Sequence, residues 1–358
     1  MGKMQRLALL RQHLCNDTSI QLHRPPPLAE HVSAGAGSAA RLSPRLPDQP
    51  PSYRLQDGAA QLAAAKAFFH SYGFVVLEDC LDESELGHLN DWYDRTQQAQ
   101  PFDWGCQQGA HMEWLYHQPL LEHAELDGYV RHDGHYPLVA ALLGGEEHAC
   151  FSEFDFRETP SGTAQDRNWH RDIGTHGFGG ADPTARQEYF ASKAHAYICS
   201  FHYLNDVTRE SPSFGVIPQS CVFVPTPDSG STVDQQLRSH LGAEFQELPL
   251  YAKAGTCVLY DISLYHSRVN ASTGARTRRA LQAYYSRDDV RPLTNWVILP
   301  QRLAEHPDPE TARFYSLQGE VQCQIDFAAG GYKHRELSPK LQNQLRVGEH
   351  AYVKPDGA

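Results

Sequence analysis

Apolar residues recur at helical spacing in the first part of the chain. They predict a helix over residues 61–72 that ends at Gly73, followed by a short buried strand over 73–78. Asp82 and Glu85 have the spacing of a helix N-cap, which predicts a second helix directly after them. A short apolar helix is expected over 137–143, although most of the region 100–148 shows no clear period.

Beyond residue 148 the pattern changes to short strands separated by turn residues. The expected strands cover residues 150–157, 168–173, 195–204, 216–218, 256–260 and 278–285. Two helical insertions are expected, over 233–241 and from Asp308 onward, where a cap residue, a proline and an acidic residue coincide. Many short strands with turns between them are typical of an all-β barrel or sandwich, here decorated by helices.

The first 52 residues follow neither pattern. Prolines at positions 25–27, 44, 47, 50 and 51 and the small residues of 34–38 are incompatible with a helix or a central strand. We therefore expect a disordered or Pro-rich extension over 1–52, one folded domain over 53–330 and a C-terminal tail over 331–358. Because the extension is basic and contains serine, an organelle transit peptide is the alternative, although Glu30 and the prolines favour a disordered leader.

Composition and charge narrow the function classes. With 41% hydrophobic and 21% charged residues, a chain of 358 residues fits a soluble globular protein with a substantial core. The net charge of −12 without a basic tract argues against a nucleic-acid partner, and no apolar run is long enough for a membrane span. The eight cysteines are scattered without a CxxC pair, which indicates reduced thiols and favours a cytoplasmic location.

His170 and Asp172 form a candidate pair of metal ligands. In an extended strand alternate side chains share a face, so these two would point the same way with Arg171 turned outward. His266 follows a strand opened by Gly255 and could supply a third ligand, because a barrel can bring distant strands together. Two histidines and one carboxylate on one side of Fe(II) leave open positions for a bidentate co-substrate and for O2. Taken alone, the His-x-Asp pattern also fits a strand-edge ion pair.

The strand over 278–285 places an arginine next to this proposed site. An α-keto acid bound to iron needs a fixed cation for its far carboxylate, and arginine offers two parallel charge-assisted hydrogen bonds. Arg276, Arg278 and Arg279 compete for the role.

A second strand, over 150–157, alternates charged residues with phenylalanines. Glu153, Asp155 and Arg157 would share one face, which is unusual for a buried strand. The alternation fits a polar substrate pocket and an exposed strand face equally well.

Several motifs in order along the chain resemble one known family. Residues 71–86 are similar to its opening strand and acidic helix cap, and 168–172 to its Trp-His-x-Asp metal motif. Residues 205–221 are similar to a stretch that usually ends in Val-Ile-Pro-Gly-Ser-His, and 266–281 to its distal ligand, asparagine turn and arginine. From about residue 67 to 287 the chain thus resembles the phytanoyl-CoA dioxygenase superfamily of Fe(II)/2-oxoglutarate oxygenases.

The resemblance implies a double-stranded β-helix core, also called a jelly roll or cupin-like fold, with flanking helices. The implied iron ligands are His170, Asp172 and His266. The implied contacts of the co-substrate 2-oxoglutarate are Arg278, Phe201 and Arg157. The implied reaction uses O2 to oxidise an unactivated C–H bond of a small organic molecule and releases succinate and CO2. Hydroxylation, desaturation and cyclisation all fit this description.

The chain departs from the family pattern at a few positions. Pro212 stands where a glycine is usual, and Gln219 and Cys221 replace the glycine and histidine that end the central motif. The gap between Asn270 and Arg278 is longer than usual, which leaves Arg276 as the second choice for the co-substrate arginine. Two other functions use the same residues: a zinc hydrolase with a His/Asp/His site and a non-catalytic jelly-roll binding module.

Overall fold

The computed structural model describes most of the region that the sequence assigns to the folded domain. The described residues are 42–99, 105–107, 113–117, 119–160, 169–172, 183–226, 229–269, 276–290, 300–304 and 306–315. The expected tail over 331–358 and most of the expected extension lie outside them.

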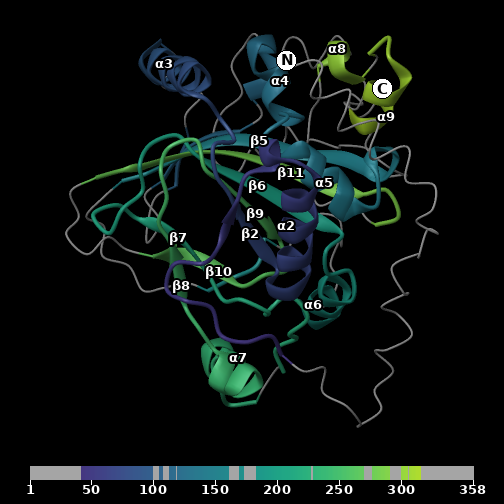
Figure 1. Cartoon of the computed structure of the whole chain (residues 1–358). Helices are drawn as coiled ribbons and strands as arrows, with labels where there is room; N and C mark the ends of the chain where they lie inside the picture. The colour runs from purple at the N-terminus through teal and green to yellow at the C-terminus, as the bar shows by residue number, and fades with distance from the viewer. Residues whose placement is uncertain are drawn as a thin grey trace, which may run out of the picture.

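Two β-sheets form the centre of the molecule (Figure 1). The larger sheet contains, in spatial order, β1 (Ser52–Tyr53), β2 (Phe74–Leu77), β9 (Cys257–Asp261), β6 (Tyr197–Tyr203), β11 (Arg278–Arg287), β5 (Ala149–Thr159), β4 (Glu113–His117) and β3 (Gly105–Gln107). The smaller sheet contains β10 (His266–Val269), β7 (Ser213–Val216) and β8 (Leu248–Leu250). Apart from the parallel pair β1 and β2, neighbouring strands are antiparallel. A mixed large sheet with a small antiparallel one confirms the predicted cupin-like β core.

The long strands at the centre of the larger sheet are buried on both faces, which favours a central position. On β11 and β6 all residues except Arg279 and Arg287 are buried, and β5 is buried along its first eight residues. Residues that alternate along β11 lie opposite alternate residues of β5 and β6, so Tyr284, Gln282 and Arg278 share one face of the sheet. This inward face carries the polar side chains of the site described below.

Helices lie around the two sheets (Figure 1). They are α2 (Ala59–Tyr72), α3 (Glu83–Ala99), α4 (Asp127–Val130), α5 (Tyr136–Leu143), α6 (Pro183–Ser192), α7 (Val233–Leu241), α8 (Gln301–Ala304) and α9 (Pro309–Tyr315). Figure 1 shows α2 and α5 side by side in front of the larger sheet, and residues of these two helices contact each other. Phe156 on β5 packs against Trp92 of α3 with ring centroids 4.4 Å apart, which fixes α3 to the sheet.

The ends of two helices follow the predicted signals. Gly73 ends α2 with a φ of 81°, a left-handed conformation that glycine adopts without steric cost. Before α3, the amide of Glu85 donates to Asp82 Oδ1 and the amide of Asp82 donates to Glu85 Oε2, both at 2.9 Å, so the capping box is complete. None of the helices in the described residues combines the length and apolarity needed to cross a bilayer.

The predicted strand over 168–173 is wrong in the part that can be judged. Residues 169–172 have no regular structure except at His170, which forms an isolated bridge with His266, while 168 and 173 lie outside the described residues. The prediction was of a continuous strand, whereas among the described residues this segment pairs only with the first residue of β10. Strand β4 was missed because its surroundings have no clear hydrophobic period.

The last residues of the expected extension pack against the domain through hydrogen bonds. The amide of Ser43 donates to Gln219 Oε1 at 2.6 Å, and Gln219 Nε2 donates back to the Ser43 carbonyl at 2.9 Å. Gln246 holds the backbone of Leu46 in the same way, at 3.2 and 3.1 Å. Two glutamine side chains, the buried Gln246 and the partly buried Gln219, thus hold the backbone of Leu46 and Ser43 against the domain.

Candidate metal centre

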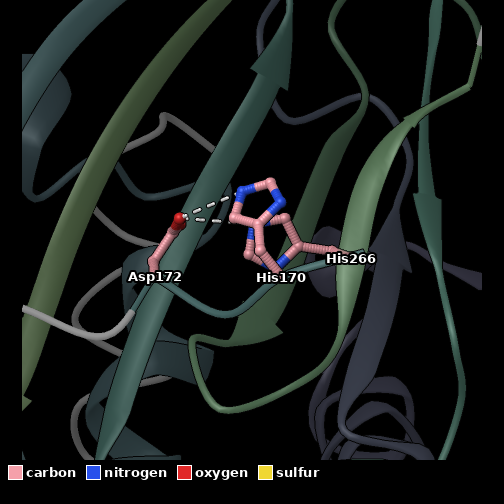
Figure 2. Close-up of side chains that lie close together, drawn as sticks. All are labelled: His170, Asp172 and His266. Carbon is pink, nitrogen blue, oxygen red and sulfur yellow. Dashed lines mark ion pairs between the residues drawn. The ribbon is translucent and has the colours of Figure 1, made fainter. Parts of the chain in front are cut away.

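His170 and His266 are brought together by their own backbones. The amide of His170 donates to the carbonyl of His266 at 3.0 Å, and the amide of His266 donates to the carbonyl of His170 at 2.9 Å. Their rings lie 4.5 Å apart between centroids. The Asp172 carboxylate faces both, with Oδ1 3.3 Å from His266 Nε2 and 3.8 Å from His170 Nε2, as Figure 2 shows. The structure thus unites the three residues that the sequence singled out.

The orientation of the His266 ring leaves one nitrogen available. Its Nδ1 lies 3.0 Å from the Leu264 carbonyl oxygen, which can only accept a hydrogen bond, so Nδ1 carries the proton. Nε2 is then the nitrogen that faces Asp172 and that would bind a metal ion, the arrangement that histidine ligands use in metal sites. His266 is buried, whereas almost half of the His170 side chain is exposed, so the site opens toward solvent on the His170 side.

Two tyrosines hold the other oxygen of Asp172. Oδ2 accepts hydrogen bonds from Tyr260 on β9 at 2.8 Å and from Tyr284 on β11 at 3.2 Å. Burial alone would raise the pKa of Asp172, but the neighbouring His266 and His170 and the hydrogen bond from Tyr260 hold that pKa well below its usual range. Burial, followed by the Asp172 charge, raises the pKa of both tyrosines, which therefore stay protonated donors. Asp172 consequently turns a single ionised oxygen, Oδ1, toward the histidines.

This donor set fits a first-row metal ion. Nitrogen and carboxylate ligands at about 2.0–2.2 Å from a metal, at right angles to each other, are about 3 Å apart. The ligand atoms of the three residues all lie within 4.8 Å of one another, and small side-chain rotations would close the remaining distance. Two imidazoles and one oxygen of a carboxylate on one side of the ion match the facial arrangement of non-haem Fe(II) oxygenases.

Arg278 lies buried on the inward face and is linked to the three residues by aromatic rings. Its side chain donates to Thr159 Oγ1 at 2.9 Å, and its guanidinium carbon lies 5.0 Å from the centroid of Phe201. Phe201 stacks on Phe214 at 5.0 Å, and Phe214 lies 5.3 Å from the ring of His266. An arginine and an aromatic wall thus flank the histidine side of the site.

The two competing arginines point elsewhere. Arg276 has a side chain that is 56% exposed and that pairs with Glu210 at 3.3 Å. Arg279 lies on the opposite face of β11, where it pairs with Asp94 at 2.7 Å and stacks over Tyr93. Among the three candidates, Arg278 is the one that faces the interior.

The charged residues of β5 line the same interior. Glu153 and Asp155 are buried, and Arg157 is half-buried, so the alternative of an exposed strand face is wrong. Burial first, and then the charges of Asp172 and Asp155, raise the pKa of Tyr284, whereas the charge of Arg157 lowers it, so these groups lie near Tyr284. The strand tolerates charges because its inward face meets a polar interior and not an apolar core.

Arg171, which was expected to turn outward from the face of His170 and Asp172, packs into the protein. It is buried, and its guanidinium donates to the carbonyls of Ser220, Cys221 and Phe223 and to Gln187 Oε1. It also lies 4.5 Å from the ring of Tyr265. The side of the segment that does not carry the site therefore packs against the loop after β7, which fixes His170 and Asp172 from behind.

Sequence reasoning missed Tyr260 and Tyr284. Tyr284 lies six residues after Arg278 in one strand, so the two share a face, and that signal was present in the sequence. Tyr260 could not be found in the same way, because the register that aligns Tyr260, Cys199 and Tyr284 in one row joins strands distant along the chain.

Comparison with known proteins assigns the family. A family model described as Phytanoyl-CoA dioxygenase (PhyH) matches residues 69–280, more than half of the chain. A curated protein, Dioxygenase af480 of Aspergillus fumigatus, is 38% identical over 71 residues, a match that spans 20% of this chain and 23% of that relative. The chain therefore matches only about a quarter of that relative's length.

Two solved structures share the fold. The non-haem alpha-ketoglutarate-dependent carbocyclase SnoK from nogalamycin biosynthesis aligns with a TM-score of 0.52 and 15% identity, over 76% of this chain and 98% of that one. The non-haem alpha-ketoglutarate-dependent epimerase SnoN from the same biosynthesis aligns with a TM-score of 0.50 and 19% identity, over 64% of this chain and 84% of that one. At these identities the likeness concerns the fold alone. Given the family match, the chain belongs to the phytanoyl-CoA dioxygenase family.

Proposed function

We propose that the protein is an Fe(II)/2-oxoglutarate-dependent dioxygenase that oxidises an unactivated C–H bond of a small organic molecule, with release of succinate and CO2. The observation that carries this proposal is the backbone pairing of His170 with His266, which places two imidazoles beside one oxygen of Asp172. Membership of the family supports the same chemistry.

The proposed iron ligands are His170 Nε2, His266 Nε2 and Asp172 Oδ1. When bound there, iron would supply open positions for a keto acid and O2 and the oxidising chemistry that C–H cleavage requires. Arg278 is proposed to bind the far carboxylate of 2-oxoglutarate, since it is buried, charged and next to Phe201. Arg157 is proposed as a further basic contact from β5.

The chain itself positions the reactants and excludes water. Tyr260 and Tyr284 keep one oxygen of Asp172 occupied, so the carboxylate offers a single ligand atom and the positions needed by the co-substrate stay open. The stacked rings of Phe201 and Phe214 form an apolar surface beside His266. Next to such a surface, an ion pair between Arg278 and the co-substrate carboxylate is stronger than in water. Hydroxylation, desaturation and ring closure share hydrogen abstraction as their first step, and the proposal covers that step.

The proposal is tested by anaerobic titration of the protein with Fe(II) and 2-oxoglutarate. The chelate of the keto acid on iron gives a visible charge-transfer band, which we expect in the parent protein and not in His170→Ala or His266→Ala. His240→Ala on α7 is the matched control and should keep the band. A band of equal strength in His170→Ala would contradict the site, and a screen of small molecules for succinate release then addresses the reaction.

A further inference from the structure

A second group of metal-binding side chains lies outside the proposed iron site. His195 precedes β6, Cys221 follows β7, and Asp261 ends β9, so three separate segments contribute. The candidate ligand atoms of these residues all lie within 4.8 Å of one another. Asp261 and Cys221 are buried and the His195 side chain is 18% exposed.

The distance between the histidine and the carboxylate suits a tetrahedral metal ion. His195 Nδ1 lies 3.1 Å from Asp261 Oδ2. Two ligands at about 2.0–2.1 Å from zinc with a tetrahedral angle are about 3.3 Å apart, so the pair already has nearly the required separation. Despite this proximity, the buried Nδ1 forms no hydrogen bond with any of the described residues.

The carboxylate of Asp261 accepts from two backbone amides and lies within hydrogen-bonding reach of the Cys221 thiol. Oδ1 accepts from the amide of Ser263 at 2.7 Å, and Oδ2 accepts from the amide of His195. Each carboxylate oxygen can accept more than one bond, so a lone pair stays available. His195 reaches Oδ2 with both its amide and its ring because its φ is 67°, a left-handed conformation that costs free energy in a residue with a side chain.

The charges of the group also permit a divalent cation. Arg171 lies nearby, but its two terminal nitrogens donate to three backbone carbonyls and Gln187, and none of the ion pairs found among the described residues joins it to Asp261. Burial raises the pKa of the Cys221 thiol, so without a metal the thiol is protonated. Metal binding would form the metal–sulfur bond and release that proton to solvent, and one thiolate with one carboxylate then balances the two charges of the ion.

We propose that His195, Cys221 and Asp261 form a binding site for a divalent metal of tetrahedral preference, zinc foremost, with water in the fourth position. A thiolate, an imidazole and a carboxylate make a donor set that suits zinc better than iron. The ion would tie together the start of β6, the end of β9 and the loop after β7. That loop also receives Arg171, so the second site stabilises the segment that carries His170 and Asp172 from its far side.

Titration of the full-length protein with Co(II) alone tests this proposal independently of the proposed function. Co(II) bound to a thiolate gives an intense near-ultraviolet charge-transfer band, which the iron site cannot give because it contains no sulfur. We expect this band at one equivalent in the His170→Ala/His266→Ala double variant. Cys221→Ser should abolish it, whereas Cys199→Ser, a buried cysteine on β6, should retain it.

A second variant covers the case in which Cys221→Ser does not fold. His195→Asn removes the imidazole while keeping a residue that tolerates a left-handed backbone, so it should fold and lose at least ten-fold in Co(II) affinity. The absence of the band from the parent protein, or its persistence in Cys221→Ser, would overturn the proposal. Either result would leave the Fe(II) and 2-oxoglutarate titration unaffected, so the two proposals can fail separately.

Discussion

Removal of the Tyr260 hydroxyl should weaken iron binding without removing any iron ligand. Tyr260→Phe keeps the ring, which lies 5.0 Å from His266 and 4.8 Å from Phe214, and deletes the hydroxyl that donates to Asp172 Oδ2 and also contacts the Cys199 thiol. A hydrogen bond to a charged group contributes about 1.5–3 kcal/mol, and loss of an outer-shell partner typically costs about 10–100-fold in metal affinity. The bond from Tyr284 is longer, 3.2 Å against 2.8 Å, so Tyr284→Phe should have the smaller effect.

The assay is anaerobic Fe(II) binding in competition with a coloured chelator. We expect the Fe(II) dissociation constant to rise about ten-fold in Tyr260→Phe and up to about a hundred-fold in Tyr260→Phe/Tyr284→Phe. Tyr285→Phe is the matched control, because Tyr285 follows Tyr284 in the chain but bonds to His135 and to the Val130 carbonyl. If the folded double variant binds Fe(II) as tightly as the parent, the tyrosines do not orient Asp172 and the reasoning is refuted.

Three further predictions concern the co-substrate, acid stability and packing. Arg278→Lys should raise the KM for 2-oxoglutarate at least ten-fold because lysine cannot form two parallel bonds, whereas Arg276→Lys should leave it unchanged; equal KM values would contradict the assignment. Burial, with the nearby His132, lowers the pKa of His202 to about 3, so the unfolded state takes up protons first as pH falls below 6.5. Stability should therefore decline between pH 6.5 and 3, by about 1.4 kcal/mol per pH unit more than in His202→Gln, and parallel urea-unfolding curves would count against this. Gly73→Ala would place a Cβ in steric conflict with Cys221 Sγ, at a φ of 81°. It should lower the unfolding free energy by about 2–4 kcal/mol in urea titration, and a loss under about 1 kcal/mol would show that the packing relaxes.

Local signals in the sequence predicted the elements whose burial is simple. The helix over 233–241 has the bounds of α7, because Thr232 and Gln235 form a capping box at its start. The strands over 195–204, 256–260 and 278–285 correspond to β6, β9 and β11, whose apolar residues are buried within the larger sheet. These elements depend on neighbours in the chain or on continuous burial, and both can be read from the sequence.

The sequence predicted correctly that His170, Asp172 and His266 lie together, but part of the reasoning was wrong. His170 and Asp172 were expected to share a face because of a strand, whereas the structure holds them in an irregular segment that is pinned by one bridge to His266 and by Arg171 behind. Pairing between such distant segments depends on tertiary register, which hydrophobic periodicity does not contain. The metal-ligand role of the three residues stays a prediction.

One departure from the family pattern has a clear physical explanation. Gln219, where a glycine is usual, has a φ of 66°, which is the conformation for which glycine is ordinarily selected. The free-energy cost of this backbone conformation is offset by the Gln219 side chain, which forms two hydrogen bonds with the backbone of Ser43. Gln219 therefore replaces the usual glycine at a position where its side chain can bind the backbone of Ser43, within residues 42–52.

The central claim is that three side chains from distant parts of the chain share one iron ion. Anomalous diffraction at the iron edge, from anaerobic crystals grown with Fe(II) and 2-oxoglutarate, measures this directly. We predict one peak within about 2.2 Å of His170 Nε2, His266 Nε2 and Asp172 Oδ1, with the co-substrate carboxylate at Arg278. A peak elsewhere, or imidazoles of His170 and His266 too far apart to share an ion, would contradict the claim.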